Sequence, residues 1–336
     1  MKEAMLYEKK ENEKVRCSLC SHRCIISDGK RGVCGVRENR KGTLYSLVYG
    51  KIIAAHVDPI EKKPFFNFLP GSASFSIATA GCNFRCLFCQ NADISQGAAK
   101  YKEMPGEPST PSEVVRLAKT KKCVSIAYTY NEPTVCFEFA YDTSVLARKE
   151  GIANLYVTNG FMTEEMLRAY GGFLDAANVD LKSFSDKFYR EVCGARLEPV
   201  LSSLRLMKKL GVWVEVTTLV VPKLNDSPEE LRQIAEFIKT ELGTETPWHI
   251  SRFHPDFRMT DRPPTPVETI HAARDIGLDV GLRYVYAGNV PGDVGENTYC
   301  HSCNELLIRR YGFSVEENKI KDGKCQHCSA KIDGRF

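Results

Sequence analysis

The chain has 336 residues, of which 43% are hydrophobic and 26% are charged, as is common in soluble globular proteins. Its 46 basic and 42 acidic residues give a net charge of only +4, which does not indicate binding to nucleic acid or to a membrane surface. No apolar run is long enough to span a bilayer, and the charged N-terminus lacks a signal-peptide core. We therefore expect a cytoplasmic protein with one large α/β domain and small additions, or two medium domains.

The chain contains fourteen cysteines, most of which fall in tight groups. Thiols stay reduced in the cytoplasm, so such groups indicate metal ligation or catalysis rather than disulfides. Only Cys123, Cys136 and Cys193 stand alone, and we expect Cys123 and Cys136 to be buried hydrophobic residues. The groups are Cys17, Cys20, Cys24 and Cys34; Cys82, Cys86 and Cys89; and Cys300, Cys303, Cys325 and Cys328.

From residue 74 onward, short β-branched or apolar runs alternate with amphipathic stretches of helical period. The predicted strands are Phe75–Ala80, Val124–Tyr130, Leu155–Asn159, Ala177–Leu181, Trp213–Val221, Trp248–Phe253 and Gly281–Tyr286. The predicted helices are Pro111–Thr120, Val135–Lys149, Glu164–Tyr170, Pro199–Leu210, Pro228–Glu241 and Pro266–Ile276. Repeated βα units predict an α/β fold with a parallel sheet, in the form of a partial or complete TIM-like (β/α) barrel.

Two segments break the βα pattern and are predicted to be appended modules. Residues 1–70 form an N-terminal Cys-rich metal-binding module, residues 71–296 form the barrel, and residues 297–336 form a C-terminal module. Between the first module and the barrel, the stretch Asp58–Pro64 could face an active-site mouth or could be a solvated linker.

The segment GCNFRCLFCQN, after the first predicted barrel strand, carries Cys82, Cys86 and Cys89 with C-x3-C-x2-C spacing. A loop with this spacing can place three thiolates around a [4Fe–4S] cluster and leave the fourth iron without a protein ligand. The position also fits, because functional residues of such barrels lie at the carboxyl ends of strands. A zinc site would need a fourth ligand, and none is adjacent in the sequence.

At these residues the chain resembles the radical S-adenosylmethionine (SAM) superfamily, and Phe88 before the last cysteine is also typical of it. The resemblance implies that the open iron binds the amino and carboxylate groups of SAM. It also implies that one electron from the cluster cleaves SAM to a 5′-deoxyadenosyl radical, which abstracts hydrogen from a substrate.

Further candidate residues follow successive strands. In the family a Gly-Gly-Glu element binds the SAM amino group, and here Tyr130 and Asn131 replace its two glycines while Glu132 remains. Thr158 and Asn159 end the next strand and could contact the ribose or the methionine part of SAM. The alternatives are ordinary turns that have no contact with a ligand.

Asp180 and Lys182 end the fourth strand on the same side, either as cofactor-binding residues or as a structural ion pair. His254, followed by a proline, ends the sixth strand and is a further cofactor-binding candidate. Catalytic candidates are Lys182, His254 and Cys193, since a thiol near a radical site could donate hydrogen.

The order of these elements resembles that of pyruvate formate-lyase activating enzyme. A narrower resemblance, to the radical SAM component of the AmmeMemoRadiSam system, rests on CSLCSHRCIISDGKRGVCGVR, DPIEKKPFFNFLPGS, GCNFRCLFCQN, YTYNEPT and YVYAGNVPG. It implies association with Memo-type and AMMECR-type proteins. An electron donor of the ferredoxin or flavodoxin type is also expected.

The two outer cysteine groups predict further metals. Cys300, Cys303, Cys325 and Cys328 form CxxC-x21-CxxC, which is typical of a zinc ribbon, with an auxiliary iron–sulfur cluster as the alternative. The N-terminal group could bind zinc or a second [4Fe–4S] cluster, and we expect a structural metal there without choosing which.

The leading hypothesis is therefore reductive SAM cleavage followed by hydrogen abstraction from an unidentified substrate. Activation of a glycyl-radical enzyme is one alternative. A zinc-ribbon binding protein with a catalytically silent barrel is an alternative of a different class, although the modest charge disfavours nucleic acid as its ligand.

Overall fold

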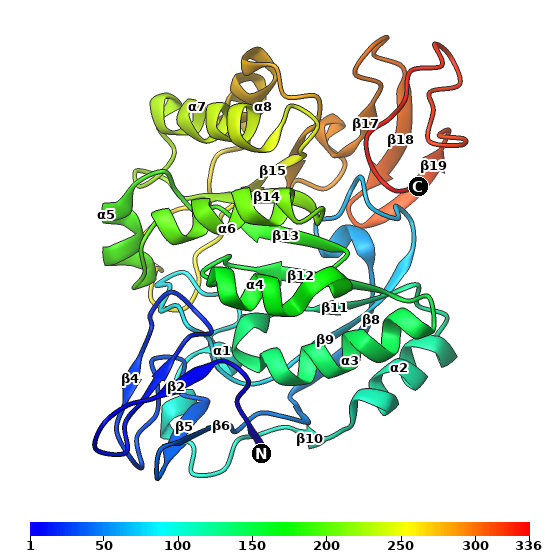
Figure 1. The fold of residues 1–336 in the computed structure, drawn as a ribbon. Helices are drawn as coiled ribbons and strands as arrows, with labels where there is room; N and C mark the ends of the chain where they lie inside the picture. The colour runs from blue at the N-terminus through cyan, green and yellow to red at the C-terminus, as the bar shows by residue number, and fades with distance from the viewer.

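An eight-stranded sheet forms the centre of the computed structural model, which describes residues 1–336 (Figure 1). Seven strands are parallel and one edge strand is antiparallel, so the predicted α/β fold with a mostly parallel sheet is confirmed. In spatial order the strands are β16 (Val285–Gly288), β15 (Trp248–Arg252), β14 (Trp213–Val220), β13 (Ala176–Asp180), β12 (Ala153–Thr158), β11 (Ser125–Tyr128), β9 (Ala73–Ala78) and β8 (Ala54–Pro59). The order ends at β16 and β8, which do not pair with each other.

All seven predicted strands are present, with ends shifted by a few residues. The sequence analysis did not predict the antiparallel strand β8. This strand is mostly exposed, and its His56 and Asp58 give it the composition of a linker. Its register with β9 places Asp58 opposite Ser74, so the segment before the barrel is part of the main sheet.

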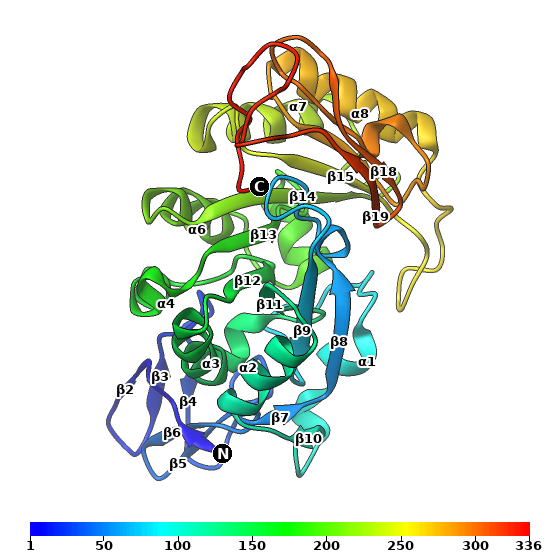
Figure 2. The same ribbon diagram turned by 90° about the vertical axis from the view of Figure 1, so that its right-hand side faces the viewer.

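Helices connect the parallel strands and lie along one side of the sheet (Figure 2). They are α2 (Pro111–Thr120), α3 (Phe137–Lys149), α4 (Glu164–Tyr170), α6 (Glu198–Lys209), α7 (Pro228–Phe237) and α8 (Val267–Val280). Two shorter helices, α1 (Ala92–Ser95) and α5 (Asp186–Phe188), lie in the segments after β9 and β13. Five-residue π-helical turns follow α5 (Tyr189–Cys193) and α7 (Ile238–Leu242). Short 3₁₀ turns lie at Ile60–Lys62, Ala98–Lys100, Pro133–Cys136, Gly171–Phe173 and Val294–Glu296.

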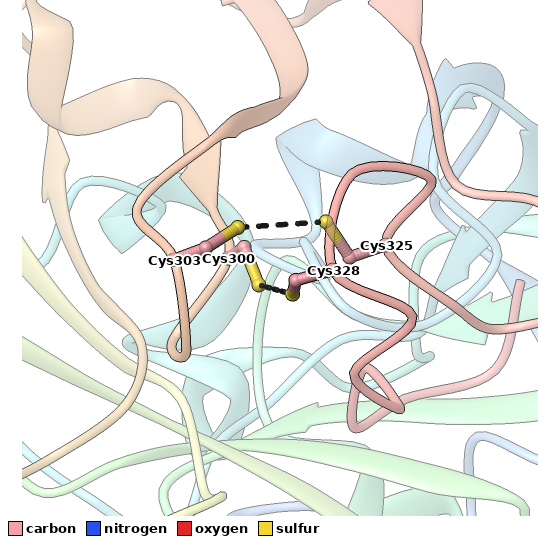
Figure 3. Close-up of side chains that lie close together, drawn as sticks. All are labelled: Cys300, Cys303, Cys325 and Cys328. Atoms are coloured by element: carbon pink, nitrogen blue, oxygen red, sulfur yellow. Dashed lines mark hydrogen bonds between the residues drawn. The ribbon is translucent and has the colours of Figure 1, made fainter.

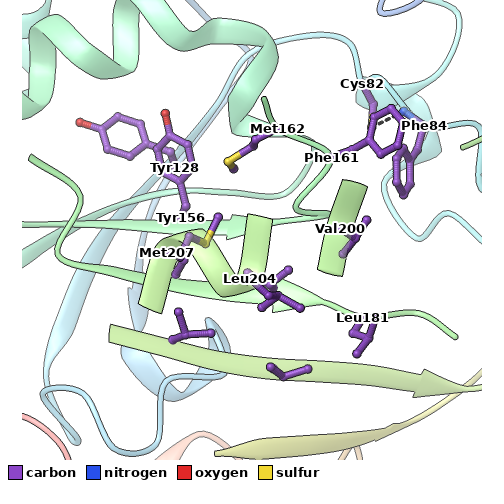
Figure 4. Packing of buried hydrophobic residues seen from close by; sticks show 14 of the residues in the cluster. Cys82, Phe84, Tyr128, Tyr156, Phe161, Met162, Leu181, Val200, Leu204 and Met207 are labelled. Carbon is purple, nitrogen blue, oxygen red and sulfur yellow. Dashed lines mark hydrogen bonds between the residues drawn. The ribbon is translucent and has the colours of Figure 1, made fainter. Parts of the chain in front are cut away.

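Helix α6 illustrates why these segments fold as they do. Its apolar residues recur at helical spacing, so Val200, Leu204 and Met207 face the sheet and are fully buried (Figure 4). Truncating one of the larger of these side chains to alanine typically costs about 2–5 kcal/mol.

Helix α7 begins with a side-chain cap. The Ser227 hydroxyl accepts a hydrogen bond from the Glu230 backbone N–H at 3.2 Å, with Pro228 at the first helical position. The Glu230 carboxylate does not form a hydrogen bond with the backbone of the capping residue Ser227. It accepts hydrogen bonds from the Ser183 hydroxyl and the Phe184 backbone N–H, and so ties α7 to the loop after β13.

The N-terminal and C-terminal segments lie at opposite ends of the sheet (Figure 1). Residues 1–46 form two small antiparallel sheets, one of β1 (Lys2–Glu3), β6 (Thr43–Ser46) and β5 (Arg37–Arg40), the other of β2 (Tyr7–Lys9), β3 (Val15–Cys17) and β4 (Ile25–Ile26). β7 (Lys51–Ile52) pairs with β10 (Glu107–Pro108). At the other end, β17 (Thr298–Tyr299), β18 (Leu306–Tyr311) and β19 (Ser314–Asn318) form a third small sheet. No helix has the length and apolar character that crossing a membrane requires.

Candidate functional site

A cavity of about 520 Å³ opens where the parallel strands end. It is lined by side chains from the loops after several strands, so residues far apart in the sequence converge there. Of the predicted site residues, those that line it are Cys82, Cys86, Cys89, Glu132, Asn159, Asp180 and Lys182.

The three cysteines lie on the loop between β9 and α1. Cys82 and Cys86 are buried and Cys89 is partly buried, with Phe84 and Phe88 beside them. No three of these thiols come within 4.8 Å of one another, so they are not arranged as a compact site for a single ion. A [4Fe–4S] cluster holds its cysteine sulfurs farther apart, since each sulfur lies beyond its own iron. The residues therefore fit such a cluster, with the cavity in front of it.

Backbone contacts fix the shape of this loop. Gly81 has φ of +94°, and a Cβ there would meet Val36 at 2.6 Å and the carbonyl oxygen of Cys34 at 2.9 Å. On the other side, the Arg85 backbone N–H donates to the Cys193 carbonyl at 2.7 Å. The cysteine loop is thus held between the N-terminal segment and the π-helical turn after α5.

Glu132 lies at the bottom of the cavity and is fully engaged by the protein. Its carboxylate accepts hydrogen bonds from the Thr134 hydroxyl, from the Thr134 backbone N–H at 2.9 Å, from the Thr158 hydroxyl at 2.8 Å and from the Asn159 backbone N–H at 2.8 Å. Burial raises the pKa of Glu132, and these donors oppose that rise. Four donors occupy the lone pairs of a carboxylate, so Glu132 organises the ends of β11 and β12.

Thr158 and Asn159 take different positions. Thr158 is buried behind Glu132 and does not line the cavity. The Asn159 side-chain amide lines it and donates to the Asn83 side-chain oxygen at 2.7 Å, which connects the third strand end to the cysteine loop.

Asp180 and Lys182 form an ion pair at 2.8 Å on the cavity wall, on the same side of the chain as expected. Burial alone would lower the pKa of Lys182, but the Asp180 carboxylate and the thiolate forms of Cys86 and Cys193 raise it well above the ordinary value. Lys182 is therefore a permanent positive charge beside the cysteines.

His254 lies in the exposed segment after β15 and is not among the residues that line the cavity. The strand ends at Arg252, so His254 is two residues beyond it. Ser251 and Asn289 line the cavity at this end instead, joined by a hydrogen bond of 2.9 Å from the Asn289 amide to the Ser251 hydroxyl.

Cys193 is fully buried on the π-helical turn and does not line the cavity. Interaction with the Cys193 thiol is the main reason why the pKa of Cys86 is lowered. The arrangement makes Cys193 a neighbour of the Cys86 sulfur behind the loop rather than a donor facing the cavity.

The sequence analysis left the Asp58–Pro64 stretch undecided, and the structure places Lys62 and Lys63 in the cavity wall. Asp58 pairs with both lysines at 2.8 Å and also accepts a hydrogen bond from the Tyr130 hydroxyl. Lys63 lies over the Tyr130 ring, 4.2 Å from its centre. The many charged residues in DPIEKKP were the available signal for a functional role, but the sequence does not show that β8 places them at the cavity.

The C-terminal cysteines form a second candidate site (Figure 3). Their four sulfurs all lie within 4.8 Å of one another, with Cys300 and Cys328 at 3.6 Å and Cys303 and Cys325 at 3.7 Å. A tetrahedral ion with metal–sulfur bonds of about 2.3 Å requires sulfurs about 3.8 Å apart. The side chains therefore fit one four-coordinate metal ion.

The N-terminal cysteines are arranged differently. Cys17 and Cys24 face each other across the β3–β4 hairpin, where the Cys17 backbone N–H donates to the Cys24 carbonyl at 2.9 Å. Cys20 lies in the turn of this hairpin, and Cys34 on the next loop. No three of these four thiols lie within 4.8 Å of one another.

The comparisons with known proteins agree with this site. Residues 76–238, which include the cysteine loop and the ends of β11 to β14, match the model of the radical SAM superfamily. An uncharacterized protein of Methanocaldococcus jannaschii is 51% identical over 335 residues, which cover 99% of both chains.

More distant relatives share part of the chain. Pyruvate formate-lyase 1-activating enzyme of Escherichia coli is 23% identical over 228 residues, covering 61% of this chain and 89% of its own. The solved structure of Streptococcus suis SuiB bound to S-adenosylmethionine shares the fold with a TM-score of 0.52 and 12% identity, covering 69% of this chain and 54% of that one. With the matching cysteine loop at the end of β9, residues 76–238 form a radical SAM domain.

Proposed function

We propose that the chain holds a [4Fe–4S] cluster on Cys82, Cys86 and Cys89, cleaves S-adenosylmethionine reductively and abstracts hydrogen from a substrate. The supporting observation is the cavity into which all three cysteines and the Asp180–Lys182 pair converge. When bound, the cluster supplies the electron that cleaves SAM to a 5′-deoxyadenosyl radical.

The chain's own residues prepare this cavity. Lys182 keeps its proton and, held by Asp180, offers fixed charge to polar groups of the bound SAM. Asn159 also offers an amide to the cavity, while Phe84 and Phe88 keep water from the cysteines. Glu132 acts indirectly, because its four donors hold the backbone of Asn159 in place.

The narrower assignment belongs to the same proposal. The motifs shared with the AmmeMemoRadiSam system lead us to propose Memo-type and AMMECR-type proteins as partners in the cytoplasm, and a ferredoxin or flavodoxin as the electron donor. The open order of the sheet favours a partial rather than a complete barrel. For the C-terminal site, the sulfur spacing favours zinc.

Glycyl-radical activation is the second candidate. It rests on the similarity to activating enzymes, which reaches 26% identity over 174 residues with the pyruvate formate-lyase-activating enzyme of Clostridium pasteurianum, covering 49% of this chain and 69% of that one. Formation of a stable glycyl radical on a co-incubated lyase, seen by electron paramagnetic resonance (EPR), would select this function.

The test of SAM cleavage is anaerobic reconstitution with iron and sulfide, followed by reduction with dithionite in the presence of SAM. We expect 5′-deoxyadenosine from the wild type and from Cys123→Ala, which removes a buried thiol distant from the cysteine groups along the chain. Cys86→Ala should give none. A wild type that carries a full cluster yet forms no 5′-deoxyadenosine would refute the proposal and favour a binding protein with a silent barrel.

A further inference from the structure

The N-terminal cysteines have no part in the function proposed above, yet their surroundings are built for a charged group. Cys17 and Cys24 pair across the β3–β4 hairpin through a hydrogen bond of 2.9 Å from the Cys17 N–H to the Cys24 carbonyl, while Cys20 lies in the turn and Cys34 on the loop that follows. Gly32 brings this loop against the hairpin, since a Cβ there would lie 3.5 Å from the Cys24 sulfur.

A buried arginine stands beside this group. Arg37 is only 1% exposed and begins β5, three residues after Cys34. One nitrogen, Nη2, donates to the Glu138 carboxylate at 2.5 Å. The other two, Nε and Nη1, are buried without a hydrogen-bond partner. Leaving two such donors unpaired is unfavourable, so a bound group with acceptor atoms and negative charge is expected here.

The spacing of the sulfurs distinguishes between the two metals that the sequence left open. The C-terminal cysteines show what a mononuclear site looks like in this chain, with all four sulfurs within 4.8 Å. The N-terminal sulfurs form no such group of three or more, and neither do those of Cys82, Cys86 and Cys89. A cluster with one iron per cysteine does not require its sulfurs to lie so close together, and its sulfides add acceptors for the free N–H groups of Arg37.

We propose that Cys17, Cys20, Cys24 and Cys34 ligate a second [4Fe–4S] cluster, whose negative charge is balanced by Arg37. Four cysteines leave no iron open, so this cluster does not bind SAM. On ligation the four thiols release their protons to solvent, and two ferrous ions, two ferric ions and four sulfides give the [4Fe–4S]2+ state without a further oxidant or reductant.

This second cluster lies next to the first. The Cys34 carbonyl and Val36 pack on Gly81, the residue before Cys82, and His22 forms a hydrogen bond of 2.7 Å with the Asn83 carbonyl. The Arg85 guanidinium also donates to the Val33 carbonyl. The two cysteine loops are therefore in direct contact, and two reduced clusters at these positions should interact magnetically.

The test compares the anaerobically reconstituted wild type with two variants and one control. The wild type and the control Cys123→Ala should each contain about eight irons and eight sulfides per chain. Cys20→Ala/Cys24→Ala should contain about four, and so should Cys82→Ala/Cys86→Ala/Cys89→Ala, in which the N-terminal cysteines are intact. The metal at the C-terminal site should not change in any of them.

EPR of the reduced samples tests whether the two clusters lie close to each other. The wild type should show a spectrum broadened by spin–spin interaction, and each variant should show the narrower signal of one cluster. A wild type with about four irons and two zinc ions per chain would overturn the proposal, as would a triple variant devoid of iron. Eight irons without SAM cleavage would leave this proposal standing and refute the proposed function alone.

Discussion

Replacing Glu132 by glutamine tests whether this residue is a structural acceptor. The Thr134 and Asn159 backbone N–H groups bind different oxygens of its carboxylate, and the Thr158 hydroxyl reaches both. Glutamine can accept at one oxygen only, so one buried N–H would face an amide donor. An unpaired buried donor costs about 1–3 kcal/mol, and weaker bonds to a neutral oxygen add about 1 kcal/mol.

We therefore expect Glu132→Gln to lower the free energy of unfolding by about 2–4 kcal/mol. The assay is urea denaturation under anaerobic conditions, followed by circular dichroism. Glu316→Gln is the matched control, because Glu316 is exposed on β19, and it should change stability by less than about 0.5 kcal/mol. A Glu132→Gln protein with the wild-type denaturation midpoint would refute the reasoning and leave Glu132 free to bind a ligand.

Three other changes have distinct expected results. Lys182→Met leaves Asp180 unpaired in the cavity, and we expect 5′-deoxyadenosine formation to fall more than about tenfold at unchanged iron content. The reason is that each increase of about 1.4 kcal/mol in the activation free energy, caused by poorer positioning of SAM, lowers the rate tenfold. An unchanged rate would contradict the role of this pair. Cys325→Ala should remove one metal ion per chain and lower the melting temperature, as measured by elemental analysis and calorimetry, and an unaltered metal content would contradict the site. Although burial raises the pKa of Asp58, its hydrogen bonds with Lys62, Lys63 and the Tyr130 hydroxyl hold that pKa well below the ordinary value of 3.8, so its stabilising effect is present above that value and is lost as the pH falls below it. Asp58→Asn should consequently lose less stability than the wild type between about pH 5 and pH 2 in thermal melts, and parallel pH profiles would contradict this.

The sequence predicted most of the sheet because buried parallel strands are nearly continuous apolar runs, and these runs alternate with amphipathic stretches of helical period. The sequence did not predict β8, because an edge strand with one antiparallel partner needs little apolar surface. For the same reason, Lys62 and Lys63 could not be assigned to the cavity before the position of that strand was known.

For the site, spacing alone predicted which cysteines belong together and which strand end they follow. It did not show how each polar residue is used. Glu132 could have faced a ligand or the backbone, and only the positions of Thr158 and Asn159 show that it faces the backbone. Likewise, His254 lies two residues beyond the end of β15 and is exposed, whereas Ser251 lies within the strand and lines the cavity.

The central claim is that SAM binds directly to a cluster held by Cys82, Cys86 and Cys89. EPR of the reduced protein, recorded with and without SAM, tests it most directly. We predict that SAM shifts the signal of this cluster in the wild type and in Cys20→Ala/Cys24→Ala, and that the shift is absent from Cys86→Ala. A cluster signal that saturating SAM leaves unchanged would contradict the claim.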